Sequence, residues 1–251
     1  MTAKKLVIPS LADIRVAESR IAGVAIRAPL VRFHGGDASA DVRLKLESLQ
    51  PIGSFKLRGA ANVIGGLSDA ALAGGVYTAS AGNMAQGVAW CARARGVQCR
   101  VVVPEQAPAT KIDAIERLGG EVIRVPFEEW WRTLVDRSHP GVEGHFIHPF
   151  ADTDVMAGNG TIGLEIFEDL DDVDAIVIPY GGGGLACGIA AAARALSPRT
   201  KVYAVEADTA APLTASLAAG VPTAVTRTPT FIDGMGSGGV FAEMWPLVQS
   251  L

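Results

Sequence analysis

One lysine of this chain lies in a setting that favours nucleophilic chemistry. The stretch Gly53–Ala60 reads Gly-Ser-Phe-Lys-Leu-Arg-Gly-Ala, so that Lys56 has the apolar neighbours Phe55 and Leu57. A lysine in an apolar site loses hydration, which lowers the pKa of its amine and favours the neutral, nucleophilic form. The ordinary alternative is a surface lysine whose charged end reaches water along an apolar stem.

Two glycine-bearing turns could bind anions. Ser80–Gly87 follows a strand pattern and opens a helical one, and backbone N–H groups at such a turn bind a carboxylate or phosphate; an ordinary capped turn is the alternative. Gly181–Gly184 also joins a strand pattern to a helical one. Backbone without side chains can wrap an anion closely, and the helix dipole adds attraction. Flexible loops seldom lie at such a junction, so this turn predicts a phosphate site. It matches neither the dinucleotide fingerprint nor a Walker loop.

The elements that must position these residues alternate between strand and helix patterns. The predicted strands are Val42–Leu46, Val76–Ala79, Arg100–Val103, Glu121–Val125, Phe146–His148, Ala175–Pro179 and Val202–Glu206. The predicted helices are Ile14–Ile21 after a cap at Asp13, Gln86–Arg95, Thr110–Leu118 and Leu185–Leu196. This alternation predicts a parallel α/β sheet, and several strands are apolar enough to be covered on both faces. The close spacing over Val76–Val125 indicates a compact subdomain inserted into a larger sheet, with a cleft between the two.

Composition limits the function classes. The 251 residues are 49% hydrophobic and 19% charged, which is enough apolar material for a sizeable core. The net charge of -4 provides no attraction for nucleic acid or an anionic membrane surface. The three cysteines, Cys91, Cys99 and Cys187, lack metal-site clustering and are typical of reduced thiols in a cytoplasmic protein.

Several of these motifs resemble those of a known family. The run Lys45–Ala60, Lys-Leu-Glu-Ser-Leu-Gln-Pro-Ile-Gly-Ser-Phe-Lys-Leu-Arg-Gly-Ala, resembles the cofactor-lysine motif of the serine/threonine dehydratases. Ser80–Gly87 resembles their asparagine loop, and Gly158–Glu165 and Gly181–Leu185 resemble two further signatures. The resemblance runs from about Pro29 to the last residue. It implies a two-domain parallel open sheet of the tryptophan-synthase β-like type (fold type II pyridoxal-phosphate enzymes), C-terminally shortened. The implied domains are a large one of residues 1–65 and 143–251, and a small inserted one of residues 66–142.

The resemblance also implies roles for particular residues. Lys56 would hold pyridoxal 5'-phosphate as a Schiff base and remove the α proton of an amino acid. The other implied cofactor contacts are Phe55 against the pyridine ring, Asn83 on the phenolic oxygen, Gly181, Gly182, Gly183 and Gly184 on the phosphate, and Gly234 beside the cofactor. The implied substrate contacts are Ser80, Ala81, Gly82, Met84 and Arg132. The expected activity is that of an ammonia-lyase, which converts L-threonine, L-serine or a related 3-hydroxy amino acid to a 2-oxo acid and ammonia.

The chain departs from the family pattern at some of these positions. Ala81 replaces the serine of the family's serine racemases, and because alanine cannot exchange a proton, it favours elimination over racemisation. Many relatives have a histidine where this chain has Met84, so the resemblance does not fix which 3-hydroxy amino acid is the substrate. Arg132 could equally be a solvated helix residue. Glu206 and Ala210 match Mg²⁺ ligands of some relatives, and a metal-free role is the alternative. For His148 the expectation is a hydrogen-bonded structural histidine.

Three alternatives to the dehydratase remain open. They are an amino-acid (serine) racemase of the same family, a β-replacement enzyme of the cysteine-synthase kind, and a truncated, non-catalytic cofactor-binding remnant. Related chains continue well past the equivalent of Leu251, and the apolar ending Met244–Leu251 suggests an interrupted helix. Such a chain is expected to expose apolar surface and therefore to form a homo-oligomer or to be poorly soluble.

Overall fold

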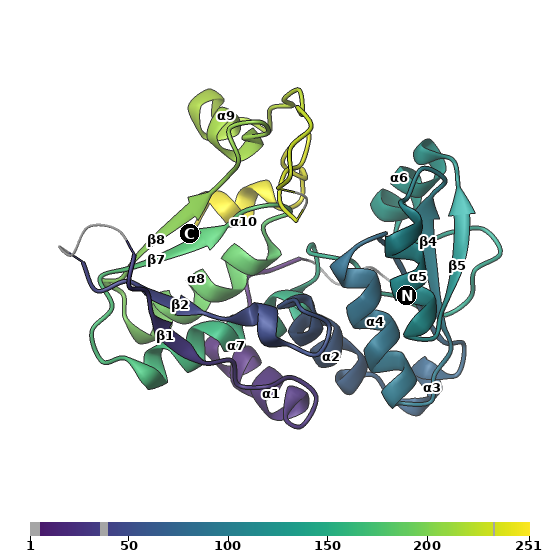
Figure 1. Cartoon of the computed structure of the whole chain (residues 1–251), viewed down its shortest axis with the longest axis horizontal. Helices are drawn as coiled ribbons and strands as arrows, with labels where there is room; N and C mark the ends of the chain where they lie inside the picture. Colours follow the sequence, from purple (N-terminus) through teal and green to yellow (C-terminus); the bar gives the residue numbers. More distant parts are fainter. Residues whose placement is uncertain (1–5, 36–39, 233) are drawn as a thin grey trace.

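The strands in the described part of the chain form three separate sheets. The structure, a computed structural model, describes residues 6–35, 40–232 and 234–251 (Figure 1). Its sheets have two, four and two strands, and helices pack between them. Within the described part, no helix is both long and apolar enough to span a bilayer. The α/β class and the strand–helix alternation predicted from the sequence are confirmed.

The four-stranded sheet is parallel throughout and has the order β5-β4-β3-β6. Its strands are β3 (Val76–Ala79), β4 (Cys99–Pro104), β5 (Gly120–Val125) and β6 (His145–Phe146). Its helices are α3 (Asp69–Leu72), α4 (Asn83–Ala94), α5 (Ala109–Arg117) and α6 (Phe127–Asp136). The two central strands are largely buried, as the apolar runs predicted. The last strand ends earlier than the predicted Phe146–His148, because Pro149 has no N–H group to continue a ladder.

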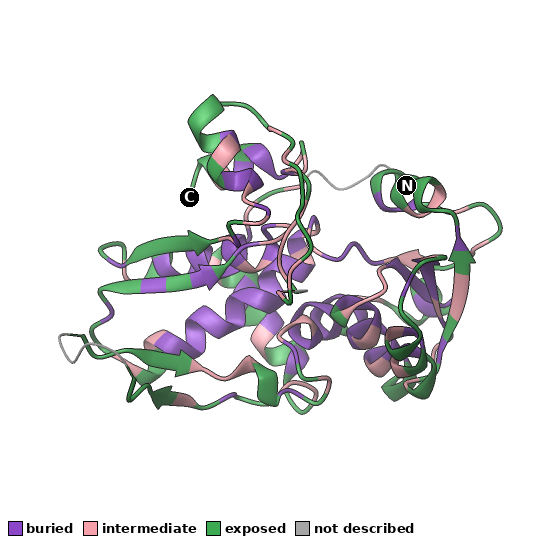
Figure 2. Cartoon of the chain, turned by 45° about the horizontal axis from the view of Figure 1, so that its top comes forward, coloured by how far each residue is buried: buried purple, intermediate pink, exposed green. Residues whose placement is uncertain are grey.

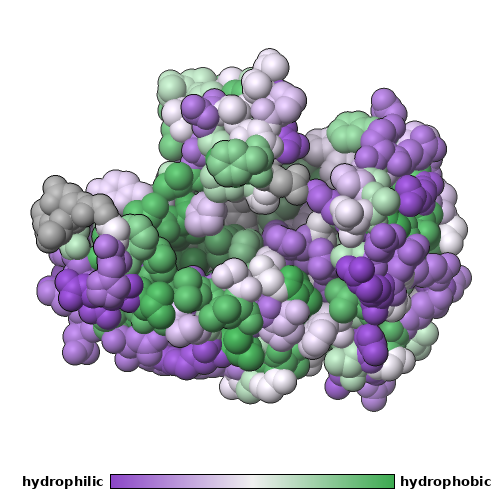
Figure 3. Space-filling view, in the orientation of Figure 1, coloured by the Kyte–Doolittle hydropathy of each residue, from purple (hydrophilic) through white to green (hydrophobic). Residues whose placement is uncertain are grey.

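The second parallel sheet consists of β7 (Ala175–Pro179) and β8 (Lys201–Val205), connected by α8 (Gly184–Leu196). Ile176 and Ile178 of β7 are buried, whereas Val177 is 66% exposed and Tyr203 of β8 is 51% exposed. The sequence predicted that several strands are covered on both faces, and β7 and β8 are not among them. The described helices cover one face only, and Figure 3 shows apolar side chains around a hollow in this part of the molecule.

The remaining elements lie around these two sheets. Strands β1 (Leu30–Arg32) and β2 (Arg43–Lys45) form an antiparallel pair. The other elements are α1 (Leu11–Ile21), the short 3-10 helix η1 (Glu47–Leu49), α2 (Lys56–Gly66), α7 (Thr153–Asp169), α9 (Pro212–Ala219) and α10 (Trp245–Gln249). Helix α1 begins after Ser10, not after the predicted cap Asp13: the Ser10 hydroxyl accepts from the Asp13 N–H, and the Asp13 carboxylate accepts from the Ser10 N–H, which forms a capping box.

Helices α2, α7 and α8 form the centre of the molecule, and Figure 2 shows how much of them is buried. They approach closely because glycines face one another. A Cβ on Gly158 of α7 would lie 2.4 Å from the carbonyl oxygen of Arg58 on α2. A Cβ on Gly188 of α8 would lie 2.2 Å from the carbonyl oxygen of Met156 on α7. Because a side chain fits at neither position, the Gly158–Glu165 motif serves helix packing, and α7 connects the beginnings of α2 and α8 rigidly.

Candidate active site

Lys56 is the first residue of α2, and its side chain turns inward. It is half-buried, and its Nζ donates a hydrogen bond of 2.6 Å to the carbonyl oxygen of Pro149. Loss of hydration lowers the pKa of Lys56 from 10.5 to about 8. The amine also lies 5.3 Å from the centroid of the Phe55 ring. This is the desolvated lysine that its apolar neighbours predicted, and it is not a surface lysine.

The tetraglycine turn, Gly181–Gly184, joins β7 to α8 against the ring and backbone of Phe150. A Cβ on Gly182 would lie 2.3 Å from the Phe150 ring, and one on Gly184 would lie 2.7 Å from the Phe150 carbonyl oxygen. Gly183 has a φ of 90°, in the left-handed region that glycine favours. Since Phe150 follows Pro149, whose carbonyl holds Lys56, the turn and the lysine meet at one short segment.

The turn Ser80–Gly87 contacts the same lysine from α4. A Cβ on Gly87 would lie 3.2 Å from the Lys56 carbonyl oxygen, so α4 packs closely on the first turn of α2. Ser80, Ala81 and Gly82 are half-buried at the beginning of α4, where the Gly82 N–H donates to the Ser80 hydroxyl at 3.2 Å. Nothing lies within 4 Å of a Cβ on Gly82, so this turn is open.

Two further predicted cofactor contacts, Asn83 and Gly234, are exposed. Asn83, the first residue of α4, is exposed. Gly234 is exposed, and the next residue, Met235, has its Cα 3.9 Å from a Cβ on Gly181. Gly234 therefore lies near the tetraglycine turn.

The other two predicted substrate contacts, Met84 and Arg132, lie on helices α4 and α6. Met84 is 1% exposed and belongs to the main hydrophobic core together with Leu57 and Val88. Its side chain faces the core because the buried side of α4 packs on α2. Arg132 is exposed on α6. The positions of these two side chains therefore offer no support for a role in substrate binding.

Glu206, predicted as a Mg²⁺ ligand, caps helix α9. Its carboxylate accepts hydrogen bonds of 2.8 Å from the N–H groups of Leu213 and Thr214, and one of 2.9 Å from the Thr214 hydroxyl. Negative charge at a helix N-terminus is stabilising, so the carboxylate has a structural role without a metal. Within the described ranges, no group of three or more His, Cys, Asp or Glu side chains could hold an ion. These residues do not fit a closed metal site, and no step is assigned to Mg²⁺.

Arg58 is the buried residue whose importance the sequence reasoning missed. It is 0% exposed and forms ion pairs with Glu47 at 2.8 Å and Glu165 at 2.6 Å. Lys45 joins this network through a 2.6 Å ion pair with Glu165. A fully charged side chain two positions after the candidate lysine, within an apolar helix face, was the signal that could have identified it.

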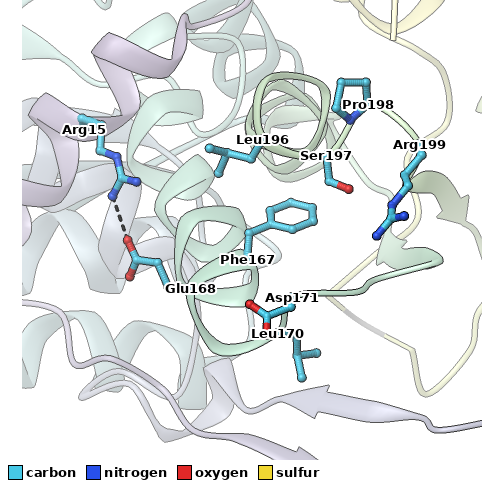
Figure 4. A pocket seen from close by; sticks show the side chains of 9 residues that line it. All are labelled: Arg15, Phe167, Glu168, Leu170, Asp171, Leu196, Ser197, Pro198 and Arg199. Carbon is cyan, nitrogen blue, oxygen red and sulfur yellow. Dashed lines mark hydrogen bonds and ion pairs between the residues drawn. The ribbon is translucent and has the colours of Figure 1, made fainter.

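A separate surface pocket of about 590 Å³ contains none of the predicted site residues (Figure 4). It lies where α7 and α8 end, next to α1, and Arg15 there forms a 2.7 Å ion pair with Glu168. The residues that line it are Arg15, Phe167, Glu168, Leu170, Asp171, Leu196, Ser197, Pro198 and Arg199.

Comparison with known proteins agrees with the geometry. A family model described as pyridoxal-phosphate dependent enzyme matches residues 21–251. The chain belongs to this family. It is 40% identical over 234 residues to the L-threonine ammonia-lyase of Thermotoga maritima, a match that covers 90% of this chain and 57% of the relative. It is 35% identical over 243 residues to a serine racemase of Oryza sativa, covering 95% of this chain and 71% of the relative.

Solved structures show the same fold. Maize serine racemase superposes with a TM-score of 0.88 at 33% identity, covering 98% of this chain and 75% of the maize chain. The processed threonine deaminase isoform 2 of Solanum lycopersicum superposes with a TM-score of 0.82 at 32% identity, covering 100% of this chain and 73% of the tomato chain. The tryptophan-synthase β-like fold predicted from the sequence is therefore confirmed. The chain spans only a little over half the length of the Thermotoga enzyme.

We expect the reactivity of Lys56 to depend on pH with a midpoint near 8. Burial lowers the pKa of this amine to about 8, so the neutral form grows as the pH rises through that value, not through 10.5 as for an ordinary lysine. Condensation with pyridoxal phosphate, trapped by borohydride and mapped by mass spectrometry, measures this fraction. Lys56→Met is the control for label elsewhere. A midpoint near 10 would contradict the desolvated environment.

We expect Gly182→Ala to destabilise the protein and to weaken its binding of pyridoxal phosphate. The new methyl group would lie 2.3 Å from the Phe150 ring, and overpacking of this kind costs about 1–3 kcal/mol. Urea unfolding measures the first effect, and titration with the cofactor the second. Gly181→Ala is the matched control for stability, because its Cβ would come no closer than 3.9 Å to Met235. Equal stability of the two variants would contradict the contact with Phe150.

Proposed function

We propose that the chain is a pyridoxal-phosphate-dependent ammonia-lyase that converts L-threonine or L-serine to a 2-oxo acid and ammonia. The observation that carries this proposal is the desolvated amine of Lys56, bound to the Pro149 carbonyl beside a glycine turn in which a Cβ fits at neither Gly182 nor Gly184. A neutral amine suits an aldehyde, and a glycine turn at a helix N-terminus suits a phosphate. The likeness to two L-threonine ammonia-lyases and a catabolic L-threonine dehydratase, at about two-fifths identity, supports the reaction class.

The residues present fit the family's cofactor. Gly181–Gly184 would hold its phosphate with backbone N–H groups, Phe55 would pack against its ring, and Asn83 would bind its phenolic oxygen. Bound to an enzyme, pyridoxal phosphate supplies an aldehyde for an amine and an electron sink for the bond broken at the substrate's α carbon.

The chain's own residues then have separate tasks. The Ser80 hydroxyl and the backbone N–H groups of the Ser80–Gly82 turn would orient the substrate carboxylate in the open space beside Gly82. Lys56 Nζ would take up the α proton, which a neutral amine can do and an ammonium group cannot. The Pro149 carbonyl would keep that amine pointed at the site between these steps.

A serine racemase is the second candidate, because racemases are among the relatives that cover most of this chain. Racemisation needs a proton donor on the opposite face of the substrate's α carbon. Ala81 has a methyl group at the position where the racemases of the family have a serine, and a methyl group donates no proton. This position favours elimination over racemisation.

The test is product analysis with the purified chain and added pyridoxal phosphate. We expect L-threonine and L-serine to release 2-oxo acid and ammonia, and L-alanine, which has no β-hydroxyl to lose, to release neither. D-serine without 2-oxo acid would favour the racemase. Cofactor bound at Lys56 with neither product would identify a non-catalytic remnant and overturn the proposed reaction.

We also propose a division into domains and a homo-oligomer. Residues 66–142 would form a small inserted domain around the four-stranded sheet, whose edge strand β6 reaches Phe146, beyond the predicted boundary. Residues 1–65 and 143–251 would form the larger cofactor domain.

The exposed apolar side chains of β7 and β8, such as Val177 and Tyr203, support self-association. Sedimentation velocity tests this: a monomer at all concentrations would contradict the oligomer.

A further inference from the structure

The turn between β6 and α7 is held by a histidine. The Nδ1 atom of His148 accepts hydrogen bonds from the N–H of Phe150 at 3.2 Å and from the N–H of Ala151 at 2.8 Å. Both partners are donors, so Nδ1 has no proton and the neutral ring has its proton on Nε2. One side chain thus fixes the backbone of four consecutive residues, His148–Ala151.

The surroundings of His148 keep the ring neutral and immobile. The residue is 0% exposed, and the rings of Phe150 and Phe241 pack against it at centroid distances of 4.6 and 5.5 Å. Burial lowers the pKa of His148 well below its ordinary value, and the charges of Arg137 and Lys56 lower it further. Its Nε2 atom is buried without a hydrogen-bond partner among the described residues. Because an unpaired buried donor is costly, an apolar ring would serve better here unless the acceptor Nδ1 were needed.

The turn that Nδ1 fixes contacts both Lys56 and the tetraglycine turn. The Pro149 carbonyl oxygen accepts the 2.6 Å hydrogen bond from Lys56. The Phe150 ring lies where a Cβ of Gly182 would be, so it sets the shape of the tetraglycine turn. A change in the backbone at these two residues would shift the Lys56 amine and the tetraglycine turn relative to each other.

We propose that His148 is a positioning residue that fixes the Lys56 amine relative to the tetraglycine turn. The proposal rests on the proposed reaction of Lys56 with pyridoxal phosphate, and it assigns His148 no contact with cofactor or substrate. A displacement of about 1 Å between reacting groups costs roughly a hundredfold in rate, so a clamp on this turn has a measurable effect.

Two variants with amide side chains test this role, because Asn and Gln place the same kind of acceptor oxygen at different distances from the backbone. The Oδ1 of His148→Asn can take the place of Nδ1 as acceptor, whereas the Oε1 of His148→Gln reaches the position of Nε2. We expect the Gln variant to condense Lys56 with pyridoxal phosphate about 10- to 100-fold more slowly, and the Asn variant to retain most of the rate. Borohydride trapping with peptide mapping measures this rate in the full chain, and urea unfolding identifies a variant that is merely unfolded.

A measurement on the unaltered chain complements the variants. Nitrogen-15 NMR of labelled histidine, with His148 assigned through the Asn variant, is expected to show an unprotonated Nδ1 and a protonated Nε2 at neutral pH. A proton on Nδ1, or equal capture rates in the folded Asn and Gln variants, overturns the proposal. Capture by Lys56 without release of 2-oxo acid overturns the proposed ammonia-lyase reaction instead and leaves the role of His148 standing.

Discussion

Lys56→Ala is expected to abolish both covalent binding of pyridoxal phosphate and release of 2-oxo acid from L-threonine. Without the amine no group holds the aldehyde, and the acid–base group next to the substrate's α carbon is lost. Removing a positioned acid–base group alone costs about 10²- to 10⁴-fold in rate, so residual turnover should fall below about one-hundredth of the original. Absorbance of the bound cofactor and a coupled assay for the 2-oxo acid measure the two effects separately.

Two further variants sharpen this result. Lys56→Arg keeps the positive charge but cannot lose a proton at accessible pH, so it should be as inactive as the alanine variant. Lys201→Ala removes an exposed lysine from β8 and should leave both readouts unchanged. Trapped cofactor at another lysine in the Lys56→Ala variant would place the reactive amine elsewhere and refute the assignment.

Arg58→Ala is expected to lower the free energy of unfolding more than any other substitution proposed above. The guanidinium forms hydrogen bonds to both oxygens of Glu47 and of Glu165, and a further one of 3.0 Å to the Thr161 hydroxyl. Removing it leaves the Glu47 carboxylate of η1 without this ion pair and leaves Glu165 of α7 with Lys45. Loss of one member of a buried ion pair costs about 3–5 kcal/mol, because the remaining charge is left uncompensated. Urea denaturation of the purified variant measures the free energy of unfolding.

The controls for Arg58 separate burial from charge. Arg95→Ala breaks an exposed pair with Asp69, 3.5 Å long, and should cost less than about 1 kcal/mol. Arg58→Lys keeps the charge but lacks the planar guanidinium that reaches two carboxylates. Its loss of unfolding free energy should therefore lie between those of Arg58→Ala and Arg95→Ala. If Arg58→Ala and Arg95→Ala cost the same, the network contributes little to the contact between α2 and α7.

Parts of the fold with a strong local signal were predictable. The strands Val76–Ala79 and Ala175–Pro179 have the predicted bounds, because each is a short apolar run followed by a turn. Helix α7 was not predicted, because Gly158, Gly160 and Gly163 each weaken a helix by about 1 kcal/mol relative to alanine. Close packing on α2 and α8, which needs these glycines, outweighs that local preference.

The candidate site was predictable to a similar degree. For the lysine and the tetraglycine turn, residue type and sequence neighbours limit the possible chemistry, whatever the rest of the fold. Met84 and Glu206 were assigned by resemblance, but the direction of the first side chain and the partners of the second depend on how α4 and α9 pack. Arg58 and His148 act through partners on other elements, or through backbone geometry, that composition does not reveal.

The sequence by itself therefore determined which residues could do chemistry: an amine among apolar neighbours and glycines where a strand passes into a helix. Such features depend on interactions between residues close in the chain. Only the tertiary structure decided that this amine meets the carbonyl of Pro149, 93 positions away, and that Phe150 lies against the glycine turn. Desolvation and long-range hydrogen bonds depend on which elements pack together, and that arrangement results from the burial of the whole core.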